Sequence, residues 1–167
     1  FPPVTYTYNG TWSPSDPNGN ATVEDDLVIA SGDAVISMDT SCNTVTVNPG
    51  ASITVNAGAT LTVADATDGL TLESTSTSYS SLLLDGTVTG TLNYERHVNI
   101  NGSGGTGDND LVSAPLTGQA FNTFAAANPN IYSTTGGTTL RFGPFDKSSA
   151  TYIEYASTET AALTPGM

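Results

Sequence analysis

Basic residues are scarce in this 167-residue sequence. Lysine and arginine number 3 against 16 aspartate and glutamate residues, so the formal net charge is −13. A protein that binds nucleic acid draws most of its affinity from basic side chains that displace counterions from phosphates, and anionic lipids recruit the same side chains. Arg96, Arg141 and Lys147 cannot build such a surface. The sequence therefore excludes nucleic acid as a partner and disfavours an anionic membrane surface.

Cysteine and histidine each occur once, as Cys42 and His97. A single cysteine excludes an internal disulfide and any zinc site built from cysteines. Cys42 lies just before a strand-like segment, where a free cysteine is expected to pack as a small apolar residue. No run of about 18 apolar residues occurs, so no membrane-spanning helix is predicted. The chain does not open with a charged and then apolar segment, so any export signal is expected to have been removed.

Threonine, serine, glycine and asparagine are abundant instead, with 28, 17, 17 and 13 residues. Threonine favours pleated positions, whereas glycine and asparagine favour tight turns, so this composition predicts an all-β protein. Between Cys42 and Tyr94, apolar residues alternate with polar ones in short bursts. Three bursts recur at a spacing of eight residues, at 45–47, 53–55 and 61–63. The alternation predicts short strands.

Strands this short fit two architectures. Glycine-alanine pairs, not Asn-Gly turns, open the bursts, and two eight-residue units with a turn make a coil of roughly 18 residues. We therefore predict a short right-handed parallel β-helix, that is a solenoid, followed by a small β module, with a β-sandwich as the alternative. In its core we expect one stacked column made of Val28, Val45 or Val47, Val63, and Leu82 or Leu84.

The predicted domain organisation has three parts. They are an N-terminal cap segment (1–26), the solenoid repeat region (27–100) and the small β module (101–167). Four glycines between residues 101 and 107 predict a flexible connection. Within the module the sequence predicts a short helix over 121–127, strands over 139–145 and 151–155, and a chain reversal at 146–149.

Several short motifs are similar to one family of proteins. They are Asn9-Gly10-Thr11-Trp12-Ser13, the segment 25–29, Cys42 with the Gly-Ala-Thr-Leu-Thr-Val run, and the segments 94–98, 111–116 and 163–166. Together they resemble the N-terminal repeats, and the module after them, of large extracellular proteins of gliding Bacteroidota exported by type IX secretion. The resemblance implies a secreted, adhesin-like protein at the cell surface. It also implies that Met167 interrupts a longer chain, so that the small β module is truncated at its C-terminal end.

Two acidic, asparagine-rich loops are candidates for Ca²⁺, which prefers oxygen ligands. One contains Asp16 and Asn18, and the other contains Asp108 and Asp110. Pro17 and the missing glutamate at the twelfth position depart from the EF-hand pattern. The alternative interpretation is turn formation and strand capping by the same side chains.

Three aromatic residues near the N-terminus, Tyr6, Tyr8 and Trp12, are candidates for glycan binding. Tyrosine and tryptophan rings offer apolar faces with a polar handle, which suits stacking on sugar rings. The competing interpretation is that they cover the first edge of the solenoid, because an open sheet edge must be protected.

No catalytic residues are predicted. Glu95, Arg96 and His97 are the only acid, cation and imidazole that are close in sequence, and a surface ion pair is the stronger interpretation. Glycoside hydrolysis would need two carboxylates facing each other across a groove, and a single sequence does not reveal such pairs. We expect a non-enzymatic structural or adhesive surface protein, a unit of a filament or surface assembly whose partners are other copies or other surface proteins. The alternative is a carbohydrate-binding or polysaccharide-degrading β-helix module.

Overall fold

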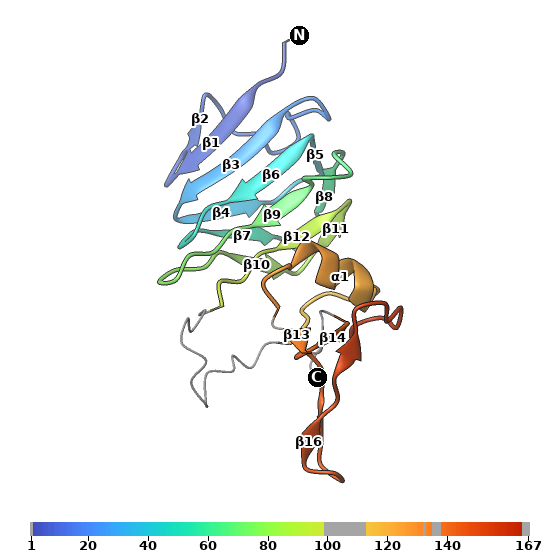
Figure 1. Cartoon of the computed structure of the whole chain (residues 1–167). Coiled ribbons are helices and arrows are strands. Elements are labelled where there is room, and N and C mark those ends of the chain that lie inside the picture. The colour runs from blue at the N-terminus through green and yellow to red at the C-terminus, as the bar shows by residue number, and fades with distance from the viewer. Residues whose placement is uncertain (1, 99–112, 132, 135–137, 165–167) are drawn as a thin grey trace. The chain divides into compact units, whose positions relative to one another are not determined.

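The computed structural model describes residues 2–98, 113–131, 133–134 and 138–164 (Figure 1). The chain divides into two compact units, Phe1–Asp108 and Asn109–Met167. The first unit holds a β-solenoid of about 4 turns over residues 5–94, and the second holds small antiparallel hairpins and one short helix. The predicted solenoid followed by a small β module is confirmed. The predicted connection at 101–107 lies outside the described residues.

Three sheets form the solenoid. Sheet A contains β1 (Thr5–Asn9), β2 (Trp12–Ser13), β3 (Asp26–Ser31), β6 (Thr44–Val47), β9 (Leu70–Leu72) and β12 (Leu92–Tyr94). Sheet B contains β4 (Asp33–Ile36), β7 (Ser52–Val55) and β10 (Ser81–Leu84). Sheet C contains β5 (Thr40–Cys42), β8 (Thr60–Val63) and β11 (Thr87–Thr89). All their ladders are parallel except that of β2 on β1, so the antiparallel sandwich alternative is wrong.

Strict alternation places the apolar residues of each coil inside. In β8, Leu61 and Val63 are buried, whereas Thr60 and Thr62 are half-buried on the outer face. Parallel pairing in register stacks each inner residue on its counterpart one coil away, as in the column Leu27, Val45, Leu70. Burying each such leucine side chain contributes about 1.5–3 kcal/mol, so the columns stabilise the solenoid.

The prediction of one core column is wrong, because the residues assigned to it do not stack on one another. Val28 pairs with Thr46 on the outer face of sheet A, while Val63 belongs to sheet C and Leu84 to sheet B. The physical reason is that a coil contains three strands, and its turns differ in length. Asp26 and Thr44 on adjacent coils are 18 residues apart, but Thr62 and Thr89 are 27 apart. A fixed spacing therefore describes only the first coils.

The N-terminal end of the solenoid is closed. β1 continues sheet A in parallel beyond β3, and the short β2 pairs antiparallel with the far side of β1. In the following segment, Pro17 is fully buried and Ala21 packs against the core. The first coil is thus covered by residues that precede it in the sequence.

The last coil is less covered. Leu84 continues the column of Ile36 and Val55, which are fully buried, yet it is 52% exposed. Tyr94 continues the column of Val47 and Leu72 and is 41% exposed. The described solenoid therefore has one closed end and one open end.

The second unit has its own small core of Phe121, Leu140 and Leu163. Its elements are α1 (Phe121–Ala127), β13 (Ser133–Thr134), β14 (Thr139–Leu140), β15 (Phe145–Asp146), β16 (Thr151–Tyr152) and β17 (Tyr155–Ala156). The predicted helix is confirmed, and it ends at Ala127 with Asn128 as its C-cap, because Pro129 disfavours a helical conformation at the residue before it. No helix of the described residues is long and apolar enough to cross a membrane.

The predicted strand pair is one hairpin with an interrupted ladder. Phe145 pairs with Tyr152 near the turn, while Leu140 pairs with Tyr155 in a separate sheet with β13. Between them, Gly143 allows close approach, since a Cβ there would lie 1.8 Å from the carbonyl oxygen of Ile153. The predicted reversal at 146–149 is confirmed, with Asp146 accepting hydrogen bonds from Ser148 and Ser149.

Candidate functional site

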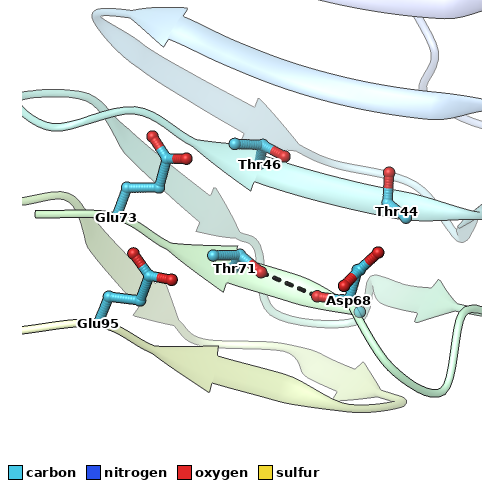
Figure 2. Close-up of a pocket in the computed structure, with 7 residues that line it drawn as sticks. Thr44, Thr46, Asp68, Thr71, Glu73 and Glu95 are labelled. Carbon is cyan, nitrogen blue, oxygen red and sulfur yellow. Dashed lines mark hydrogen bonds between the residues drawn. The ribbon is translucent and has the colours of Figure 1, made fainter.

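A polar pocket of about 320 Å³ lies on the outer face of sheet A (Figure 2). The residues that line it are Thr44, Thr46, Asp68, Gly69, Thr71, Glu73 and Glu95. Thr46 and Thr71 are neighbours in the β6–β9 ladder, and Figure 2 shows them between Glu73 and Glu95 at one end and Asp68 with Thr44 at the other. The pocket is thus lined by hydroxyl and carboxylate oxygens on a rigid sheet.

Glu73 and Glu95 occupy the same position on successive coils. Each follows the last residue of its strand, and each backbone N–H donates to the coil before it: Glu73 to the Val47 carbonyl at 3.1 Å and Glu95 to the Leu72 carbonyl at 2.9 Å. Parallel strands lie about 4.8 Å apart, so this register places two like charges side by side. The ion pair seen among the described residues, Arg141 with Glu154, is in the other unit. Like charges directly opposite one another are unfavourable, which makes this edge of the pocket receptive to a cationic or hydrogen-donating group.

Asp68 is held at the other end by its backbone. Its carbonyl accepts hydrogen bonds from the Thr71 hydroxyl at 2.8 Å and from the Asn93 amide at 2.8 Å. Its N–H donates to Asp65 at 2.7 Å. The backbone N–H groups of Asp68 and Thr67 lower the pKa of the Asp65 carboxyl, so this turn keeps its charge in weak acid.

The predicted calcium residues Asp16 and Asn18 form a turn that caps a sheet edge. The backbone N–H and the side-chain amide of Asn18 donate to Asp16 Oδ1 at 2.9 and 2.8 Å. The same amide donates to the Val35 carbonyl at 3.1 Å and accepts from the Ser37 N–H at 2.7 Å, at the free edge of β4. The Asn18 side chain thus takes the place of a neighbouring strand.

The second calcium candidate, with Asp108 and Asp110, lies outside the described residues. The described part of the chain contains no group of three or more His, Cys, Asp or Glu residues placed to hold a metal ion. Calcium binding at either loop therefore stays a prediction.

The three aromatic candidates come together at the closed end without forming one exposed face. Tyr6 is a buried core residue, 8% exposed. Tyr8 and Trp12 are half-buried cross-strand neighbours whose rings meet edge to face, with centroids 5.1 Å apart. Their positions match the covering role better than a flat stacking platform.

Among the described residues, Arg96 does not form the predicted ion pair. Its guanidinium lies 4.7 Å from the centroid of the Tyr79 ring, a cation–π contact. The backbone N–H of His97 donates to the Ser74 hydroxyl at 2.5 Å. Tyr79 is distant from Arg96 in the sequence, so sequence proximity could not predict this contact.

Cys42 packs in the core as predicted. It is fully buried, and desolvation, with smaller contributions from the charges of Asp26 and Asp25, raises the pKa of its thiol to about 12. Its thiol approaches the Thr62 carbonyl at 3.7 Å. The thiol is therefore protonated and unreactive in the folded protein.

Sequence reasoning missed the role of Asp25, which is 6% exposed. Its carboxylate accepts hydrogen bonds from the Val4 N–H at 2.7 Å, the Thr22 N–H at 2.8 Å and the Thr22 hydroxyl at 2.9 Å. The backbone N–H groups of Thr22 and Val4 lower the pKa of this carboxyl. The Thr-x-x-Asp spacing from Thr22 to Asp25 was the available signal.

The fold and the pocket define a parallel β-solenoid protein with hydroxyl-rich outer faces. No protein-family model, curated protein or solved structure matches this chain.

Proposed function

We propose that this protein is a non-enzymatic, extracellular structural or adhesive surface protein that works as a unit of a larger assembly. The single observation that carries the proposal is the difference between the two solenoid ends. The first coil is covered by β1, β2 and the turn at Asn18, whereas inner-column residues Leu84 and Tyr94 of the last coil are half exposed. An uncovered sheet end is a template for pairing with another chain.

The resemblance to surface proteins of gliding Bacteroidota, exported by type IX secretion, supports the same proposal. Those proteins act outside the cell. A solenoid held by continuous parallel ladders is a stiff spacer, which suits an adhesive or filamentous surface structure.

The experiment is sedimentation velocity over a wide range of protein concentrations, combined with electron micrographs of the same samples. We expect concentration-dependent species larger than the 17.0 kDa chain. A parallel series with Ca²⁺ and with chelator tests whether the loop containing Asp108 and Asp110 contributes. A chain that stays monomeric at all concentrations, with and without Ca²⁺, would contradict the proposal.

The pocket on sheet A favours a second candidate, carbohydrate binding. Its hydroxyl and carboxylate oxygens can accept hydrogen bonds from sugar hydroxyl groups. A glycan array tests binding, and a reducing-end assay tests cleavage. We expect the double variant Glu73→Gln and Glu95→Gln to lose any glycan signal while Glu24→Gln, on an exposed carboxylate outside the pocket, keeps it. Release of reducing ends would instead indicate a glycoside hydrolase.

A further inference from the structure

The open end of the solenoid combines apolar and acidic side chains. Leu84 and Tyr94 are 52% and 41% exposed, although the residues above them in their columns are almost fully buried. Asp85 and Glu95, each directly after one of these residues, are exposed carboxylates. The nearby cation Arg96 is engaged by the Tyr79 ring. A partner for this end must therefore offer an extended, apolar strand with positive charge.

The N-terminal end of another copy's solenoid cannot be that partner. There, β2 occupies the edge of β1, and the Asn18 side chain already pairs with the edge of β4 at Val35 and Ser37. Simple stacking of closed end on open end would have to displace these groups.

The hairpin β15–β16 in the second unit has the required properties. Phe145 and Tyr152 are 52% and 51% exposed, and their rings contact each other with centroids 5.1 Å apart. Ile153 is 47% exposed beside them. Among the described residues, β15 and β16 pair only with each other. A two-stranded hairpin is marginally stable alone, so it gains from an additional strand or apolar cover.

Charge is complementary as well. Lys147 is exposed at the tip of this hairpin, whereas Asp146 beside it is a half-buried carboxylate whose negative charge is stabilised within the turn by Ser148 and Ser149. Glu73 and Glu95, which form no ion pair with another described residue, make a row of two carboxylates toward the open end. Opposite charges steer two surfaces together and fix their register.

We propose that the β15–β16 hairpin of one molecule adds to the open last coil of a second copy of this chain. The inference rests on the proposed function and names the contact that builds the assembly. The two surfaces are different patches of one molecule, so the interface is heterologous and each copy keeps one free donor and one free acceptor. Addition then continues from copy to copy, and the protein grows into an open chain.

The test uses two full-length variants, each with one surface blocked. Leu84→Lys blocks the open end, and Tyr152→Glu blocks the hairpin; both residues are about half exposed, so the fold is retained. Lack of Cys42 reaction with a thiol reagent verifies folding. We expect each variant alone to associate at least about tenfold more weakly than the unmodified chain. Their equimolar mixture should form 1:1 dimers and stop there, because one intact surface remains on each molecule.

Sedimentation velocity distinguishes the outcomes. If the mixture stays monomeric while the unmodified protein assembles, the hairpin and the open end are not partners between copies, and the inference is overturned. If the Tyr152→Glu variant associates as strongly as the unmodified chain, the inference is also overturned, but the proposed function is not. A monomeric unmodified protein overturns both. Met38→Lys and Met38→Glu are matched controls at a 57% exposed residue near the closed end, and they should assemble normally.

A charge exchange tests the pairing itself. Lys147→Glu is expected to weaken association, and adding Glu95→Lys to the same chain is expected to restore it. Adding Glu24→Lys instead changes the net charge equally at an exposed site before the first coil and should not restore association. If Glu95→Lys and Glu24→Lys restore association equally, only net charge matters, and the pairing of Lys147 with Glu95 is overturned.

Discussion

Asp25 joins the segment before the solenoid to its first coil. Its carboxylate receives N–H groups from Val4 and Thr22, which are far apart in sequence, and it is almost fully buried. A buried acceptor with three donors aimed at it has a large effect on stability when it is changed, because the donors lose their partner.

Asp25→Asn tests this directly. One amide oxygen replaces two carboxylate oxygens, so at least one backbone N–H faces an NH₂ group, and we expect a loss of about 2 kcal/mol in the free energy of unfolding at pH 7. The lowered pKa of Asp25 means that its stabilisation is present above the unfolded value of 3.8 and is lost as pH falls through the folded value. Urea titrations at pH 7 and in acid should therefore show the difference shrinking below about pH 4.

The control for this prediction is Asp33→Asn, an exposed carboxylate that accepts one hydroxyl hydrogen bond from Ser52. It should change stability little at either pH. An Asp25→Asn difference that stays constant down to strong acid would contradict the account.

At the scale of elements, the turns of the solenoid depend on glycine for two different reasons. Gly58 has φ +84° with no other atom near its would-be Cβ, so it supplies backbone conformation alone. Gly90 has φ +119°, and a Cβ there would lie 2.3 Å from the Val63 carbonyl oxygen. The second position therefore combines conformation with close packing of one coil on the previous one.

Alanine substitutions separate these effects. Gly58→Ala is expected to cost about 1–2 kcal/mol, the cost of a left-handed residue with a Cβ. Gly90→Ala is expected to cost about 3 kcal/mol or more, since overpacking against backbone is added. Equilibrium urea unfolding followed by circular dichroism measures both. Equal losses would mean that the contact with Val63 is unimportant.

The same elements show how far sequence alone could go. The alternation at 45–47, 53–55 and 61–63 predicts the strands and their inner faces correctly, because period-2 patterns follow directly from strand geometry. The stacking partners could not be predicted, since they depend on turn lengths that vary between coils. The pocket was also missed as a site, because Thr46, Asp68 and Glu95 come from three separate coils.

At the scale of the whole molecule, the two units have cores of very different size. The solenoid core continues through columns of buried residues such as Val45, Ile53 and Leu61, whereas the second unit buries Phe121, Leu140 and Leu163 among the residues described. Local stability follows the number of buried apolar contacts. The second unit is therefore expected to open more readily than the solenoid.

Hydrogen exchange read by mass spectrometry checks this expectation. Amides of β6, β7 and β8, in the middle coil, should exchange most slowly, and those of β10 to β12 should be less protected. Amides of β15 and β16 should exchange fastest in dilute protein and become protected in concentrated protein, if the hairpin is covered in an assembly. Uniform protection across both units would contradict the expectation.

The closed end also affects the order in which the chain can fold. β1, β2 and the turn at Asn18 precede every complete coil in the chain. A polypeptide that emerges N-terminus first presents these residues before any coil, so the first coil folds together with its cover, and each later coil adds to one that is already ordered. Non-native pairing is limited to the newest edge at every moment. The solenoid can therefore assemble in the order of synthesis, and the coil edge formed most recently is the one still able to accept a strand.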